Sequence, residues 1–136
     1  MQQPNLPKIS ESEWAVMKVI WGSAPITAEE IKLRLPEDNE WSEGTVRTFV
    51  NRLLKKGAIG FEKSGRTYLY YPLVSEQECV RSESRSFLKR VFGGAADLMM
   101  TNFLEEVQLS DQEIERLQRM LADKQQRKNG PQGPES

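Results

Sequence analysis

The sequence predicts a mainly α-helical protein with a small β-hairpin: a winged helix-turn-helix domain followed by a helical dimerisation domain. Three short amphipathic helix patterns come first, two β-prone runs around a glycine-containing turn follow them, and three longer helix patterns fill the rest. We expect residues 1–73 to form the winged helix and residues 74–123 the dimerisation domain. The polar residues 124–136, which end in glycine and proline, are expected to be a disordered tail.

The composition excludes several classes of protein. Hydrophobic residues make up 38% of the chain and charged residues 29%, and no apolar run approaches the roughly 18 residues of a membrane span. The chain has no histidine and one cysteine, Cys79, which argues against a zinc site, a disulfide and histidine-based catalysis. It also lacks a phosphate-binding loop and a nucleophile motif. We therefore expect a cytoplasmic protein that is not an enzyme and has no catalytic residue, metal or cofactor.

Capping boxes mark the start of the first two helices. Ser10 and Glu13 have the spacing at which each side chain accepts a hydrogen bond from the other residue's backbone N–H, and Thr27 and Glu30 repeat it. An apolar stripe follows each box, which predicts an amphipathic helix in both places. We expect the first helix to end at Gly22, because glycine is common just past a helix C-terminus.

The third helix has two sharply different faces. We expect Ser42 to cap it and Gly57 to follow its end. One face carries small or hydrogen-bonding side chains such as Thr45, Arg47 and Asn51. The other face is a buried stripe of Val46, Phe49, Val50, Leu53 and Leu54.

The charge distribution indicates what the polar face binds. The whole chain has a net charge of −1, yet residues 44–73 carry six basic side chains and one acidic one, a net charge of +5. Arginine can donate two hydrogen bonds to guanine, asparagine pairs with adenine, and threonine contacts a thymine methyl or a phosphate. The alternative interpretation is a basic face that is merely solvated.

The hairpin adds a second basic element beside the third helix. Gly65 and Arg66 lie at its turn and Lys63 just before it, and an arginine on a tight turn suits the minor groove or the adjoining phosphates. A solubilising turn is the alternative, but two basic elements on one side of the fold favour DNA binding. The strand aromatics Tyr68, Tyr70 and Tyr71 are expected to pack rather than to stack on bases. The predicted DNA-binding residues are Ser42, Thr45, Arg47, Thr48, Asn51, Arg52, Lys55, Lys63 and Arg66.

The three C-terminal helices are expected to pair with a second copy of the chain. About fifty residues are too few for an independent core, although each helix has a wide apolar stripe. A two-fold dimer would present two recognition helices to an inverted-repeat operator. The predicted dimerisation residues are Phe87, Val91, Leu98, Phe103, Leu104, Ile114, Leu117 and Leu121.

Specific motifs resemble the BlaI/MecI/CopY (penicillinase repressor) family of winged-helix regulators. The resemblance extends from about Ile9 to Ala122 and is most specific around the start of the third helix. The residues that carry it include Trp41-Ser42, Thr45-Val46-Arg47-Thr48, Asn51-Arg52-Leu53, Gly65-Arg66 and Phe92-Gly93-Gly94.

The resemblance implies a homodimeric repressor that binds double-stranded operators with TACA/TGTA-type inverted repeats. It places Thr45, Arg47, Thr48 and Arg52 at the recognition helix and Arg66 at the wing contact. Copper-responsive members carry a C-terminal Cys-x-Cys cluster, which this sequence lacks, so copper sensing is not expected.

Penicillin-linked members lose activity when a membrane-linked sensor protease system cuts an Asn–Phe bond. Asn102-Phe103 stands at the matching place. A second interpretation, compatible with the first, is that Phe103 packs in the dimer core. A winged helix also serves in some proteins as a protein–protein interaction module without DNA binding, which is the principal alternative function.

Overall fold

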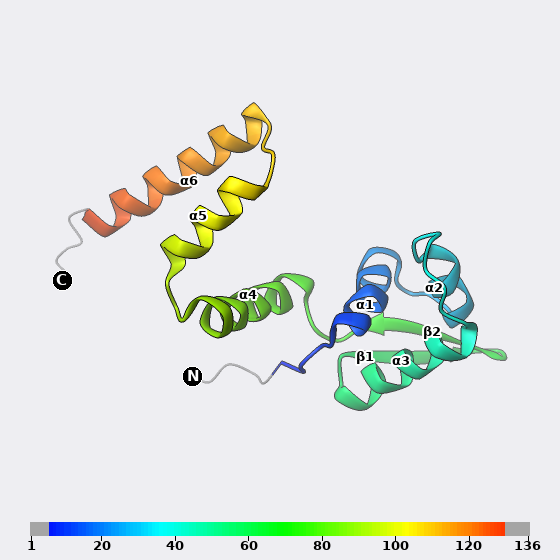
Figure 1. Cartoon of the computed structure of the whole chain (residues 1–136). Helices are drawn as coiled ribbons and strands as arrows, with labels where there is room; N and C mark the ends of the chain where they lie inside the picture. Colours follow the sequence, from blue (N-terminus) through cyan, green and yellow to red (C-terminus); the bar gives the residue numbers. More distant parts are fainter. Residues whose placement is uncertain (1–5, 130–136) are drawn as a thin grey trace. The chain divides into compact units, whose positions relative to one another are not determined.

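The computed structural model describes residues 6–129, which form six helices and one two-stranded sheet (Figure 1). Contacts divide the chain into two compact units between Phe87 and Leu88. The first unit contains the winged helix, in the order helix, helix, helix, hairpin, and confirms the predicted fold class. None of the described helices is long and apolar enough to cross a membrane.

Three helices begin the first unit: α1 (Glu11–Ser23), α2 (Ala28–Arg34) and α3 (Glu43–Lys56). Both predicted capping boxes form at the starts of α1 and α2, and the Ser42 hydroxyl caps α3. Gly57 follows α3 in the left-handed conformation with φ of 79°, which glycine adopts without a steric penalty.

The predicted end of α1 at Gly22 is wrong. Gly22 is helical, and α1 continues to Ser23 before Ala24 turns to an extended conformation ahead of Pro25. A residue before proline is disfavoured in the helical region because it clashes with the proline ring. Proline, and not glycine, therefore ends α1.

The hairpin joins β1 (Ile59–Ser64) and β2 (Thr67–Pro72) in an antiparallel ladder. Gly65 has φ of 64° at the turn, as a tight connection requires. A bridge that the sequence did not predict connects Ile26 to Tyr70: the Ile26 N–H donates to the Tyr70 carbonyl at 3.1 Å, and the reciprocal bond is 2.8 Å. This bridge fixes the connection between α1 and α2 to the base of the wing.

One apolar core joins the helices and the hairpin of the first unit. The apolar stripes of α1, α2 and α3 converge there, and Ile59 and Tyr70 close the core from the sheet. Trp21 is half-buried at the edge, where its indole N–H donates to the Val74 carbonyl at 2.9 Å. The apolar helix residues with the lowest exposure are Val16, Met17, Ile20, Ile31, Val46, Val50 and Leu53.

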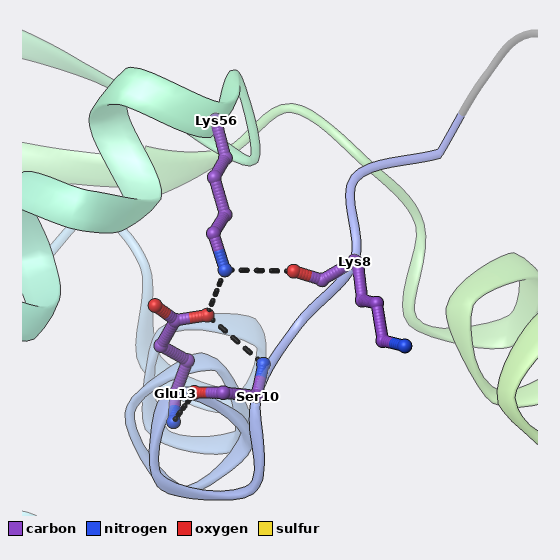
Figure 2. A network of polar contacts seen from close by, with 4 residues as sticks. All are labelled: Lys8, Ser10, Glu13 and Lys56. Atoms are coloured by element: carbon purple, nitrogen blue, oxygen red, sulfur yellow. Dashed lines mark hydrogen bonds and ion pairs between the residues drawn. The ribbon is translucent and has the colours of Figure 1, made fainter.

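A partly buried ion pair connects the end of α3 to the start of α1 (Figure 2). Glu13 is only 1% exposed, and its Oε1 accepts from Lys56 Nζ at 2.5 Å and from the Ser10 N–H at 2.9 Å. The same Lys56 ammonium donates to the Lys8 carbonyl at 2.7 Å. Burial alone would raise the pKa of Glu13, but the bonds from Lys56 and Ser10 outweigh it and hold that pKa below its usual value.

The remaining helices are α4 (Glu76–Phe92), α5 (Ala96–Glu106) and α6 (Asp111–Asn129). The start of α4 belongs to the first unit because Cys79 is buried in its core, so the contact boundary falls after Phe87 and not after residue 73. Sequence patterning missed this because a single cysteine gives no periodic signal.

The helix α6 extends beyond the expected boundary at residue 123. Residues 124–129 are helical, so the predicted disordered tail is wrong for them. Lysine, glutamine and arginine are all good helix formers, and two cations in the last turn suit the helix dipole. Residues 130–136 of the predicted tail lie outside the described part of the chain.

Candidate nucleic-acid interface

The polar face of α3 is exposed because its opposite face is buried in the core. Val46, Val50 and Leu53 point into the core at intervals of three and four residues. That packing leaves Arg47, Asn51 and the other predicted DNA-binding residues of the helix on the solvent side; all are exposed except Thr45, which is half-buried. The helix is therefore presented as a rigid, two-faced element.

Hydroxyl groups at the start of α3 are already committed to the helix. Ser42 Oγ accepts from the Thr45 N–H at 3.1 Å and lies 3.1 Å from Thr45 Oγ1. Thr48 Oγ1 donates to the Gly44 carbonyl at 3.0 Å. These bonds order the first turn and leave the hydroxyl oxygens as acceptors.

The two arginines of α3 have different surroundings. Arg47 Nη2 lies 3.3 Å from Glu43 Oε2, one turn earlier on the same helix. Arg52 lies over the Phe49 ring, with its guanidinium carbon 5.5 Å from the ring centre, and Phe49 in turn contacts Trp41 at 4.8 Å between ring centres. Both cations are thus restricted before any DNA arrives.

The wing and the recognition helix meet at one hollow of about 280 Å³. Arg47 from α3 and Arg66 from the hairpin turn both line it, so the structure brings together two predicted DNA-binding residues that are distant in sequence. Lys63 is exposed on β1, opposite Tyr68, and is not part of the lining. The remaining lining comes from the start of α2 and from β2: Thr27, Ala28, Glu29, Thr67, Tyr68 and Tyr70.

The aromatic residues of the wing divide into two groups. Tyr70 is buried, as predicted, and burial raises the pKa of its hydroxyl. Tyr68 is exposed, and its ring meets the exposed Phe61 edge-on across the hairpin at 5.0 Å. This pair stiffens the wing that carries Arg66.

Three charged residues have roles that the sequence reasoning missed. Lys56 contributed to the count of positive charge in residues 44–73, but its ammonium is paired with the buried Glu13. Glu43 pairs with Arg47, and Glu29 lines the hollow. The spacing of four residues between Glu43 and Arg47 was the available signal, because such pairs face each other on a helix.

Comparisons with known proteins identify the family of the chain. Residues 9–123 match the family model described as Penicillinase repressor. The "Penicillinase repressor" of Bacillus licheniformis is 40% identical over 90% of this chain and 96% of its own length. The "Methicillin resistance regulatory protein MecI" of Staphylococcus aureus (strain N315) is 36% identical over 84% of this chain and 93% of its own length.

The chain belongs to the penicillinase repressor family. The resemblance to BlaI and MecI that the α3 and wing motifs predicted is thereby confirmed. As a member of this family, the chain is a DNA-binding transcriptional repressor and not an enzyme.

Two solved structures are similar to parts of the chain. The solution structure of the DNA-binding domain of the repressor BlaI is 38% identical and covers 56% of this chain and 93% of its own, with a TM-score of 0.49. The transcription regulator MepR of Staphylococcus aureus is 17% identical and covers 85% of this chain and 77% of its own, with a TM-score of 0.51; it shows a shared fold alone.

Proposed function

We propose that this repressor binds an inverted-repeat operator as a homodimer, with one α3 and one wing on each half-site. One observation carries the proposal: the polar face of α3 and the tip of the wing converge in a single unit, where Arg47 and Arg66 line one hollow. A helix in the major groove with a basic turn beside it is a known docking geometry. The predicted contacts to bases and phosphates come from this surface.

The dimer is proposed from the apolar side chains of the last three helices. No residue of α5 or α6 is buried within the described chain, although many are large and apolar. An exposed apolar set of this size is normally covered by a partner. A second copy covers it with self-complementary faces under two-fold symmetry. The exposed members of the predicted set are Val91, Leu98, Phe103, Leu104, Ile114, Leu117 and Leu121, while Phe87 is half-buried.

The names of the relatives suggest what the repressor controls. They are a penicillinase repressor and methicillin resistance regulators. We propose that this chain acts in the cytoplasm on genes that respond to β-lactams or another cell-wall signal, through operators of TACA/TGTA type. Its own promoter is the first place to look for such an operator.

Derepression is proposed to follow cleavage between Asn102 and Phe103, by a membrane-linked sensor protease system. The bond lies inside α5, where Asn102 Nδ2 donates to the Leu98 carbonyl at 2.9 Å, so a protease needs the helix to open first. One feature favours opening: the N-cap of α5 is Ala95, which makes no side-chain cap hydrogen bond.

Cleavage there would remove most of the apolar surface of the dimer without touching α3. Immunoblots of cells treated with a β-lactam should show a shortened repressor, and an Asn102→Asp/Phe103→Ala variant should persist. If the chain stays intact while its target genes are induced, another mechanism operates.

The binding proposal is tested by mobility-shift assays with full-length repressor. The probes are duplexes with two inverted TACA/TGTA half-sites at varied spacing, and a scrambled duplex of equal composition. We expect tight binding to one spacing, with two copies per duplex, and a steep loss of affinity with salt. Equal affinity for the scrambled duplex, or binding that does not depend on salt, would contradict the proposal.

A further inference from the structure

We propose that Glu43 is a specificity-determining residue of this repressor, because it positions Arg47 for base contact and withholds it from phosphates. The inference rests on the proposed operator binding and deepens it. Glu43 is an acidic residue on the polar face of α3, where the other charged side chains are basic.

The geometry of the pair carries the inference. Glu43 Oε2 lies 3.3 Å from Arg47 Nη2, and both side chains are about half exposed on the first turns of α3. Glutamate four residues before a cation is the favourable orientation on a helix. The carboxylate occupies one nitrogen of the guanidinium, while the other nitrogens keep donors that can pair with guanine O6 and N7.

The hollow beside Arg47 offers that arginine a second use, the binding of a backbone phosphate, which competes with its pairing to Glu43. Arg47 and Arg66 both line it, together with hydroxyl-bearing Thr27 and Thr67 and the single carboxylate of Glu29. Two guanidinium groups around one hollow can take a backbone phosphate, which carries no sequence information. A carboxylate on Arg47 opposes that use, because it neutralises one of the two cations.

Two measurable consequences follow from the charge of Glu43. Its negative charge repels phosphates and so weakens binding to all DNA. Its ion pair with Arg47 also orders the arginine side chain before binding, so a base contact costs less conformational entropy. A loss of Glu43 should therefore strengthen binding to random DNA while it weakens discrimination. A residue that only stabilised the helix would leave the ratio of operator to random affinity unchanged.

The test compares Glu43→Gln with Glu37→Gln in the full-length repressor. Glu37 is exposed in the connection before α3, so its replacement changes the net charge equally without altering the pair. Affinities for the operator and for a scrambled duplex are measured over a range of salt concentrations. We expect Glu43→Gln to lower the ratio of operator to scrambled affinity about five- to tenfold. The salt dependence on scrambled DNA should steepen by about 0.9, as for one more phosphate contact.

The second part of the test repeats the Glu43→Gln measurement in the Arg47→Ala variant. In that background Glu43→Gln should no longer change the ratio, because the positioned group is gone. The inference is overturned if Glu37→Gln lowers the ratio equally, or if Glu43→Gln lowers it as much without Arg47. Unchanged discrimination by Glu43→Gln also overturns it. Failure of the unmodified repressor to prefer the operator would instead refute the proposed function.

Discussion

The two capping boxes at Ser10/Glu13 and Ser110/Glu113 are identical in sequence logic but differ in surroundings. Both have a serine that accepts from the N3 backbone and a glutamate that reaches back. In the first unit Glu13 is buried and paired with Lys56, whereas Glu113 lies on a helix with no buried residue within the described chain. The same local motif is thus part of a core in one region and a surface feature in the other.

The comparison extends to whole regions. The winged-helix unit buries apolar residues from all three of its first helices and from the hairpin. In α5 and α6 apolar side chains recur at similar helical spacing, but none of them is buried within the described chain. We infer that the first unit folds by itself and that the C-terminal helices depend on a partner.

The largest effect is expected from a chain that ends at Phe87. It keeps the contact-defined first unit, including Cys79, and should be a folded monomer. Its affinity for the inverted repeat should fall about a hundredfold or more, because the second half-site loses its effective concentration. Sedimentation and mobility-shift assays check both statements. If the shortened chain binds the inverted repeat as tightly as the full chain, or if it still dimerises, the inference that only the C-terminal helices depend on a partner is contradicted.

Glu13→Ala should destabilise the first unit by about 2–3 kcal/mol. It removes the carboxylate that accepts from the Ser10 N–H and leaves Lys56 without its ionic partner. The exposure of about one third of the Lys56 side chain reduces the cost, because water partly solvates the unpaired ammonium. Glu113→Ala, the matched change in the C-terminal helices, should have a much smaller effect. Urea unfolding of both variants measures the difference in the free energy of unfolding. Similar losses of stability would show that the ion pair of Glu13 with Lys56 contributes nothing beyond the helix cap.

The same carboxylate should make stability depend on pH. Its pKa in the folded chain is lowered, so its contribution is fully present above the ordinary glutamate pKa of about 4.3 and is lost as pH falls through the folded value. Glu13→Gln should remove this acid dependence. Parallel unfolding curves for both proteins below pH 5 would contradict the assignment.

Arg47→Ala should cost about 1–3 kcal/mol of operator binding if its guanidinium contacts a base. The loss should be larger on the operator than on a scrambled duplex. An equal loss on both duplexes would assign Arg47 to the backbone, together with Arg66 at their common hollow.

The smallest effect is expected from Lys55→Ala. Lys55 is exposed near the end of α3, outside the hollow. Its removal should weaken operator and scrambled binding alike, by about threefold, and flatten the salt dependence by about 0.9. A selective loss on the operator would move Lys55 to the base-reading group.

Particular residues show how far sequence reasoning extends. The two faces of α3 follow from residue spacing, so Val50 in the core and Arg47 on the surface were both predicted. The caps at Ser10, Thr27 and Ser42 were predicted too, because a cap needs only neighbours within three residues.

Long-range partners could not be predicted in this way. The pairing of Lys56 with Glu13 spans 43 positions, and the bridge between Ile26 and Tyr70 spans more than forty. No periodic pattern connects residues at such separations. The clearest consequence concerns Lys56, whose positive charge is neutralised by the buried Glu13 carboxylate.

The sequence by itself determined the order of elements, their caps and the separation of apolar and polar faces, because these depend on neighbours along the chain. The tertiary structure decided which charges remain available. It paired Lys56 with the buried Glu13 and brought Arg66 of the wing to the hollow that Arg47 lines. The physical reason is that electrostatic interactions depend on distance and burial, which exist only once the core has placed the helices and the hairpin together.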